Sequence, residues 1–383
     1  WLKLLAGVDA PAPGACLFAV GDDDQSIYAF RGAEVGNMRA FEREFRVENV
    51  IRLEQNYRSF GNILDAANAL IQHNQARLGK NLWTDAGAGE PIRVFAGFSD
   101  LDEAHYVVDE ARALIREGAP PRQIALLYRS NAQSRVLEHQ LFTAGVPYRV
   151  HGGLRFFDRQ EVKHALAYLR LIVNPDDDTA FVRVVNFPAR GIGSRSFEAL
   201  QDAAHRANSS LYNAAAGLPG KAGAAVGNFI RLIEALRAET QGVSLPEVIE
   251  HLIERSGLRA HYLGEKEGRE RLENLDELVS AATRFLQEED DTLVNPAEGD
   301  ALSAFLAHAS LEAGEHQAGE GQDAVQLMTV HAAKGLEFDA VFITGLEQGL
   351  FPHENSELER DGLEEERRLM YVAITRARQR LYL

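Results

Sequence analysis

Several features that would indicate a secreted, membrane or metal-dependent protein are missing from this sequence. The 383 residues include a single cysteine, Cys16, so a disulfide framework is excluded and a reducing compartment is expected. No apolar run approaches the roughly 20 residues of a membrane-spanning helix, and the first residues show no signal-peptide pattern. The twelve histidines show no metal-binding spacing such as His-Glu-x-x-His. We therefore expect a cytoplasmic protein without a structural metal.

A phosphate-binding loop of the form Gly-x-x-x-x-Gly-Lys-Ser/Thr is also absent. The pair Gly220-Lys221 is followed by Ala222 and fails the pattern. An acidic run, Gly21–Ala33, nevertheless follows the apolar stretch Cys16–Val20, which the pattern predicts to be a buried strand of a parallel sheet. The carboxyl end of such a strand is where α/β proteins place groups that contact phosphates.

Four polar and aromatic runs occur in order along the chain: Gly21–Ala33, Leu53–Ser59, Thr329–Phe338 and Glu364–Ala377. They resemble motifs III, IV, V and VI of UvrD-type superfamily 1A DNA helicases, a family that includes the Rep and PcrA helicases. Residues 127–135 and 152–161 resemble further blocks of that family. One such match can arise by chance, but four in the family's order and spacing indicate membership.

The net charge of −17, taken alone, argues against a nucleic-acid partner, because proteins that neutralise phosphates usually show a basic face. The charge is unevenly spread: acidic clusters lie at 176–178, 288–291 and 364–366, whereas arginines recur inside the motif runs. Local contacts combined with base stacking remain compatible with DNA binding.

Alternating strand and helix patterns predict an α/β fold with a parallel sheet. Strands are expected at 49–53, 91–95, 124–128, 148–150, 325–329 and 340–344, and helices at 63–71, 101–116 and 132–144. Helical patterns alone fill 160–310, with breaks expected at 214–227 and 288–300. The resemblance implies the end of a first RecA-like domain, 1A, at 1–52. It also implies a second RecA-like domain, 2A, at 53–152 and 322–383, interrupted by a helical domain, 2B, at 153–321.

The resemblance also implies roles in ATP hydrolysis for five residues: Gln25, Tyr57, Arg58, Glu337 and Arg376. Arg58 and Arg376 match the two arginines that reach the γ-phosphate, a task suited to a permanently charged planar donor. Gln25 matches the glutamine that senses the γ-phosphate. Tyr57 matches the aromatic residue that stacks on adenine, and Glu337 the acid that accepts from a ribose hydroxyl.

Each of these residues also has a simpler interpretation. Arg376 could be a solvated group or a cap for the last carbonyls of a helix. Tyr57 could cover the edge of a core, and Glu337 could be a surface carboxylate. The presence of all the motif runs favours the family roles.

The resemblance further implies single-strand contacts at Tyr28, Phe30, Arg31, Arg129, Asn131 and His331. Phe30 would stack on an unpaired base beside Arg31 on the backbone, and stacking contributes about 1–3 kcal/mol per base. Tyr28 would help to couple the DNA side to the nucleotide side. The alternatives are a core aromatic for Phe30 and a partly buried, hydrogen-bonded imidazole for His331.

The run Arg190-Gly191-Ile192-Gly193-Ser194-Arg195 resembles the Gly-Ile-Gly turn of helix-hairpin-helix elements. Its glycines would let backbone amides approach a duplex phosphate between the side chains of Arg190 and Arg195. Short turns of this kind are common between helices, so the pattern is weak by itself. Its matching position in the family's 2B domain strengthens the interpretation.

The family's phosphate loop and the acidic pair that holds Mg²⁺ are expected upstream of Trp1. The chain is therefore interpreted as part of an ATP- and Mg²⁺-dependent 3′-to-5′ DNA helicase of excision and mismatch repair, inactive by itself. The expected partners are single-stranded DNA, single-strand/duplex junctions and repair proteins, with no membrane. The alternatives are a Rep- or PcrA-like replication helicase and a non-enzymatic module that binds DNA or other proteins.

Overall fold

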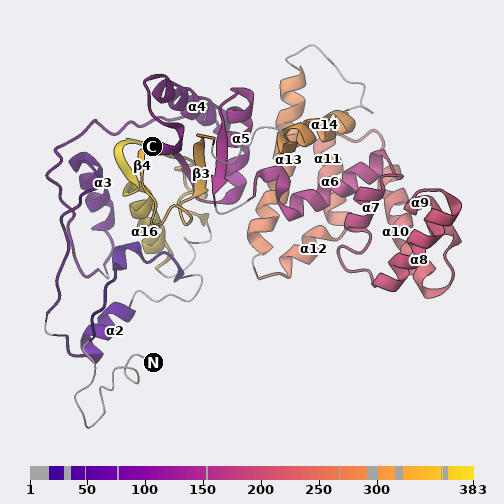
Figure 1. Cartoon of the computed structure of the whole chain (residues 1–383), viewed down its shortest axis with the longest axis horizontal. Coiled ribbons are helices and arrows are strands. Elements are labelled where there is room, and N and C mark those ends of the chain that lie inside the picture. Colours follow the sequence, from indigo (N-terminus) through magenta and orange to yellow (C-terminus); the bar gives the residue numbers. More distant parts are fainter. Residues whose placement is uncertain are drawn as a thin grey trace, which may run out of the picture. The chain divides into compact units, whose positions relative to one another are not determined.

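The computed structural model in Figure 1 describes residues 17–29, 36–47, 49–75, 77–151, 154–266, 268–290, 301–314, 322–354, 356 and 361–383. The chain divides into two compact units. The first, here called the sheet unit, comprises Trp1–Arg129 and Gln322–Leu383. The second, here called the helical unit, comprises Ser130–Gly321. The α/β class expected from the sequence is confirmed.

Parallel strands form the centre of the sheet unit. They are β1 (Ile124–Tyr128), β3 (Val325–Thr329), β4 (Phe338–Ile343) and β5 (Ala377–Tyr382), in the order β3-β1-β4-β5. Leu126 of β1 pairs with Leu327 of β3 on one side and with Phe342 of β4 on the other. All five residues of β1 are buried, as expected for an unbroken apolar run in a parallel sheet covered on both faces.

Among the described residues, the helices of the sheet unit are α2 (Asn37–Glu44), α3 (Gly61–Ile71), α4 (Asp100–Arg116) and α16 (Gly362–Ile374). Helices α3 and α16 pack against each other, and buried side chains such as Ile63 and Leu369 join them to the sheet in one core. Helix α4 begins where the Ser99 hydroxyl accepts a hydrogen bond of 3.1 Å from the Asp102 amide, which satisfies one donor of the first turn.

Where the structure describes the helical unit, its regular elements are one short strand, β2 (Tyr148–His151), and helices. The helices are α5 (Ser134–Thr143), α6 (Gln160–Val173), α7 (Asp178–Val184), α8 (Ser194–Ala207), α9 (Leu211–Ala214), α10 (Gly220–Glu239), α11 (Leu245–Arg255), α12 (Leu258–Leu263), α13 (Gly268–Asp290) and α14 (Ala301–Gly314). They enclose a core of aliphatic and aromatic side chains, with Phe181 packing edge-on against Phe229.

The helical unit begins before the predicted domain boundary at 152/153 because α5 is bonded into it. Arg159 Nη2 donates to the Ser134 hydroxyl at 2.6 Å, and Arg159 Nη1 donates to Asn274 of α13 at 2.7 Å. Ser134 in turn donates to the buried carboxylate of Glu138 at 2.6 Å. This buried polar network ties the start of α5 to α6 and α13.

The predicted elements at 63–71, 101–116, 124–128, 148–150, 160–310, 325–329 and 340–344 are confirmed within a few residues where the structure describes them. The predicted break at 214–227 is wrong in its second half, because α10 already begins at Gly220. At 91–95 no strand forms, but the segment lies along the end of β5: Arg93 makes a parallel bridge to Tyr382, and the Phe95 amide donates to the Leu383 carbonyl at 2.8 Å.

Two predicted strands do not form. Residues 17–20 and 49–53 have no regular structure, and Phe18 and Leu53 expose 88% and 79% of their surface. Both segments are mostly apolar, but among the described residues no strand pairs with them and no helix covers them. Apolar character alone predicts a buried strand only where a neighbouring strand supplies hydrogen bonds.

Among the helices that the structure describes, none combines the length and the apolar composition needed to cross a membrane.

Candidate functional site

Arg58 and Glu337 form an ion pair across 279 residues of sequence. Arg58 Nε donates to Glu337 Oε2, and Arg378 Nη2 donates to the other oxygen of the same carboxylate. These hydrogen bonds, from Arg378 and then from Arg58, hold the pKa of Glu337 below its usual range. The carboxylate therefore stays ionised near neutral pH and lies between two guanidinium groups.

The local sequence holds Arg58 in place through an Asn-initiated turn. The Asn56 side-chain oxygen accepts from the amides of Arg58 and Ser59, each at 2.8 Å. The Ser59 hydroxyl donates to the Ala377 carbonyl at 2.6 Å, which fastens the turn to the start of β5. Arg58 Nη1 also donates to the Thr375 carbonyl at 3.3 Å. The guanidinium is thus positioned at the junction of α16 and β5.

Arg376 lies at this junction and is almost completely buried, with 2% exposure. Its guanidinium donates to the carbonyls of Val372 and Leu336 at 3.0 and 2.9 Å and to the Thr375 hydroxyl at 3.1 Å. Burial, followed by the nearby charge of Arg58, lowers the pKa of Arg376 to about 10. Arg376 therefore remains charged at neutral pH, and its burial excludes the solvated surface group considered as one alternative. Its bond to the Val372 carbonyl, in the last turn of α16, is the capping contact considered as the other.

Tyr57 projects from the same turn and is 87% exposed. Its hydroxyl donates to the Gln55 side chain at 2.9 Å. A tyrosine that only covered the edge of a core would be largely buried. The exposed ring is available for stacking on a planar group, and it lies one residue from Arg58.

Gln25 ends the short 3-10 helix η1 (Asp23–Gln25). Its amide donates to Asp22 Oδ2 at 2.7 Å, and its backbone carbonyl accepts from Lys334 Nζ at 2.7 Å. Within the described residues, no hydrogen bond joins the Gln25 amide to Arg58 or Arg376. The structure therefore places the glutamine in the same unit as the two arginines but directs its amide toward Asp22.

The three acidic residues before Gln25 are held by the segment after α3. Asp24, with 1% exposure, accepts two hydrogen bonds from Arg77, and Asp23 Oδ2 accepts from the Leu78 amide at 2.7 Å. Asp22 pairs with Lys80. The sequence analysis gave no role to Arg77 or Lys80. Arg77 stands 53 residues from Asp24, so no local pattern indicates this pairing.

Arg129 and His331 occupy the same unit. Arg129 donates three hydrogen bonds of 2.8–3.1 Å to Glu366, a carboxylate with 3% exposure. The His331 ring lies 6.3 Å from the ring of Tyr28, over which Lys334 Nζ lies at 4.9 Å. Tyr28 thus connects the acidic turn to the run that contains His331. Phe30 and Arg31 lie outside the described residues.

Comparisons with known proteins decide the family of this chain. Residues 51–383 match the UvrD-like helicase C-terminal domain, and residues 1–46 match the UvrD/REP helicase N-terminal domain. The chain belongs to the UvrD-like helicase family. It is 50% identical to DNA helicase II of Escherichia coli (strain K12) over 391 residues, which cover 100% of this chain and 53% of that protein.

Two further members show the same relationship. DNA helicase II of Haemophilus influenzae is 47% identical over 100% of this chain and 52% of its own length. The ATP-dependent DNA helicase PcrA of Bacillus subtilis is 44% identical over 96% of this chain and 50% of its own length. The chain thus spans about half the length of the curated relatives that it matches.

The Gly-Ile-Gly turn of this UvrD-like chain lies in the helical unit, before α8. Gly191 has a φ of +75°, which favours glycine, and Gly193 is the residue that precedes the first turn of α8. Both glycines and Arg195 are exposed. Ile192 is buried, with 4% exposure, and anchors the turn to the core.

Arg190 points into the helical unit. Its guanidinium donates to the carbonyls of Val184, Pro188 and Ser256 at 3.2, 3.0 and 2.8 Å. It also lies 5.4 Å from the ring centre of Phe229. The two arginines that flank the turn therefore differ: Arg190 supports the fold, while Arg195 is exposed. Asn131, the remaining predicted contact, donates to Glu270 of α13.

Proposed function

We propose that this chain is part of an ATP-dependent DNA helicase that moves 3′-to-5′ along single-stranded DNA. The observation that carries the proposal is the cluster of Arg58, Glu337 and Arg376 beside the exposed ring of Tyr57. Catalysis of phosphoryl transfer is mostly positioning and charge stabilisation. Fixed guanidinium groups suit the phosphates, and an exposed aromatic ring suits the base.

The ion pair between Arg58 and Glu337 supplies a switch in this proposal. The γ-phosphate of ATP offers Arg58 a more highly charged acceptor that can bind a guanidinium through two hydrogen bonds. When Arg58 turns to the phosphate, Glu337 keeps Arg378 and gains an oxygen that accepts from a ribose hydroxyl. Hydrolysis and phosphate release return Arg58 to Glu337.

Gln25 and Arg376 complete the nucleotide response. The Gln25 amide leaves Asp22 to reach the γ-phosphate and the attacking water. Arg376 donates three of its five N–H groups to the protein, so two remain for a phosphate oxygen. Because Gln25 belongs to proposed domain 1A (1–52) and both arginines to 2A (53–152 and 322–383), this response would close the cleft between two domains.

The acidic turn does not fit a Mg²⁺ site. Asp22, Asp23 and Asp24 lie close together, but each is already bound by Lys80, the Leu78 amide or Arg77. These three carboxylates therefore serve to hold the acidic turn and are not proposed as metal ligands. The phosphate loop is also absent from the 383 residues, and we propose that the chain alone does not hydrolyse ATP.

DNA contacts are proposed for both units. In the sheet unit, Tyr28, Phe30, Arg31, Arg129 and His331 face single-stranded DNA. In the helical unit, the proposed 2B domain (153–321), Gly191, Gly193 and Arg195 contact a duplex phosphate near a junction, while Arg190 holds the turn. Asn131 contacts the single strand after leaving Glu270. Arg129 leaves Glu366 when it contacts the single strand.

The proposed cellular role is excision and mismatch repair in the cytoplasm, together with repair proteins. The identity of 50% with DNA helicase II, against 44% with PcrA, favours this role over a PcrA-like or Rep-like role in replication. A non-enzymatic module that binds DNA or other proteins is the second candidate, because the helical unit has a core of its own.

ATP hydrolysis with and without single-stranded DNA tests the proposal. The folded 383-residue chain should show no turnover, whereas the complete protein that carries it should show DNA-stimulated turnover. Turnover by the chain alone would mean that it contains a phosphate site other than the one proposed. A complete protein that binds DNA but never hydrolyses ATP would support the non-enzymatic alternative.

A further inference from the structure

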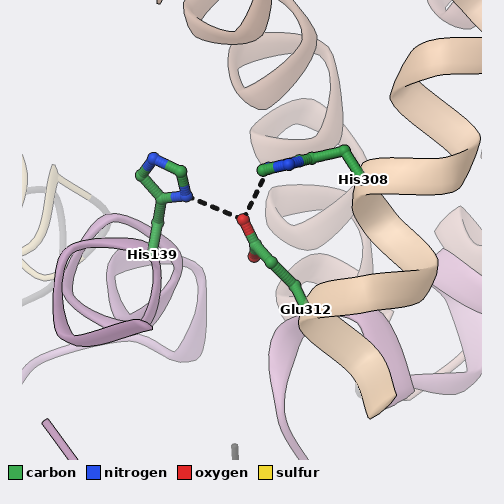
Figure 2. A group of neighbouring side chains, drawn as sticks. All are labelled: His139, His308 and Glu312. Atoms are coloured by element: carbon green, nitrogen blue, oxygen red, sulfur yellow. Dashed lines mark hydrogen bonds and ion pairs between the residues drawn. The ribbon is translucent and has the colours of Figure 1, made fainter. Parts of the chain in front are cut away.

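Three side chains converge between α5 and α14 in the helical unit (Figure 2). Glu312 Oε1 lies 2.7 Å from His139 Nδ1 and 2.7 Å from His308 Nε2. Glu312 and His139 are largely buried, at 6% and 9% exposure, while the His308 side chain keeps 23%. The cluster is therefore enclosed on the protein side and accessible from solvent past His308.

Two imidazoles and one carboxylate are a donor set that suits zinc-like ions. His308 and Glu312 are four residues apart on α14, so their side chains share one face of the helix. His139 comes from α5, 173 residues away from Glu312 in sequence. The potential ligand atoms all lie within 4.8 Å of one another.

We propose that His139, His308 and Glu312 form a binding site for a divalent first-row transition-metal ion of the zinc class. In a tetrahedral zinc site with bonds of about 2.0–2.1 Å, neighbouring ligand atoms are about 3.3 Å apart. The observed separations of 2.7 Å to the carboxylate widen to this value by small side-chain rotations. Three protein ligands leave the fourth position for a water molecule, and the ion ties α5 to α14.

Metal binding at this site depends on where the two imidazoles hold their protons. A metal needs a lone pair on each imidazole nitrogen that faces Glu312, so a neutral ring that carries its proton there must hold it on the other nitrogen instead. Because protons and the metal compete for the same imidazole nitrogens, binding strengthens as the pH rises.

Arg135 is the cationic group that opposes the ion. Its Nη2 lies 3.4 Å from Glu312 Oε1, its side chain is buried, and its Nε has no hydrogen-bond partner among the residues that the structure describes. The positive charge of Arg135 weakens metal binding, but its Nε–H can donate to a water molecule bound to the ion. Removing this charge should therefore tighten the site, an effect opposite in sign to the loss of a ligand.

Titration of the metal-stripped 383-residue chain with Co²⁺, and with Zn²⁺ in competition with a chromophoric chelator, tests the proposal. One equivalent should bind, with visible Co²⁺ absorption typical of low coordination number. His308→Gln removes a ligand and should weaken metal binding by more than about tenfold. Changing a residue that only supports a ligand already weakens metal affinity by about 10- to 100-fold. Arg135→Gln should tighten binding.

His251→Gln is the matched control. His251 Nε2 lies 2.7 Å from Glu239 Oε2 in the same unit, but it is an exposed pair, and its loss should leave metal binding unchanged. Titration of the unaltered chain at pH 7 and pH 5.5 should show weaker metal binding at the lower pH, a result that needs no variant. No saturable binding, or equal binding by His308→Gln, would overturn the proposal and leave the cluster as an ion-paired contact.

Discussion

Arg77 holds Asp24 through two parallel hydrogen bonds, from Nε to Oδ1 at 2.7 Å and from Nη2 to Oδ2 at 2.8 Å. Asp24 is 1% exposed and the Arg77 side chain 11%. This bidentate pair fastens the acidic turn of η1 to the segment that follows α3. In the proposed enzyme, the same contact positions Gln25, which ends η1, relative to the arginines of 2A.

Arg77→Ala is expected to destabilise the sheet unit. Breaking a buried pair from one side leaves an uncompensated charge and costs about 3–5 kcal/mol. Urea unfolding followed by circular dichroism measures the loss. Arg93→Ala is the control, because Arg93 pairs with Glu110 at 2.8 Å but is 50% exposed, and such surface pairs contribute about 0–1 kcal/mol. Equal losses for the two variants would contradict a structural role for the Arg77 pair.

The buried imidazole of His164 should make the folded chain less stable in acid. Burial, assisted by the charges of Arg183, His261 and Arg271, lowers the pKa of His164 from 6.5 to about 4. The unfolded chain therefore binds more protons than the folded chain between these values, and stability falls as the pH decreases from about 6.5 to about 4. The full effect is about 3 kcal/mol.

His164→Gln isolates this effect. His164 is 5% exposed and its Nδ1 lies 2.8 Å from the Tyr262 hydroxyl, a contact that glutamine can replace without titrating. Urea unfolding at pH 7 and pH 4.5 should show a smaller acid-induced loss for the variant than for the unaltered chain. Parallel profiles would show that His164 does not titrate as argued.

Tyr57→Ala in the complete protein is expected to raise the KM for ATP with little change in kcat. Stacking of a base on an aromatic ring contributes about 1–3 kcal/mol, which corresponds to about 5- to 150-fold in affinity. Tyr57→Phe should behave like the unaltered protein, because the hydroxyl bonds only to Gln55 among the described residues. Steady-state ATPase kinetics separate the two constants. An unchanged KM in Tyr57→Ala would exclude adenine stacking.

Substitutions of Arg195 and of Arg190 should have different effects, although the two residues flank the same turn. Arg195→Ala is expected to weaken duplex binding and reduce the slope of log affinity against log salt by about 1, as for one lost phosphate contact. Arg190→Ala should instead destabilise the helical unit by about 2–3 kcal/mol, because carbonyl groups lose a charged donor. Fluorescence anisotropy at several salt concentrations and urea unfolding distinguish these outcomes. A duplex-binding defect in a stable Arg190→Ala protein would reverse the assignment.

Local patterns predicted the sheet and most helices because their evidence lies within short windows. β1 is a continuous apolar run, β3 is mostly apolar, and α4 follows its capping residue Ser99 with acidic residues in the first turn. The strands predicted at 17–20 and 49–53 do not form, because an apolar run becomes a buried strand only where other elements cover it. The order of the motif runs assigned Arg58 and Glu337 to the same nucleotide site, although 279 residues separate them in sequence.

Side-chain direction and long-range clusters lay beyond the sequence. Nothing in the run that contains Arg190 and Arg195 indicates that only the first turns inward. The meeting of His139 with His308 and Glu312 depends on the packing of α5 against α14. The only local sign was the four-residue spacing on α14, which is too common to predict a site.

ATPase measurements on Arg58→Ala and Arg380→Ala in the complete protein test the central claim most directly. Arg380 lies on the same strand as Arg378 and pairs with the surface carboxylates of Glu90 and Glu117, so it serves as the control. Arg58→Ala should lower DNA-stimulated kcat by about 10³-fold or more, as for other arginines that stabilise phosphoryl transfer, and leave single-strand affinity nearly unchanged. Arg380→Ala should retain full turnover. Normal turnover by a folded Arg58→Ala protein would contradict the proposed nucleotide site.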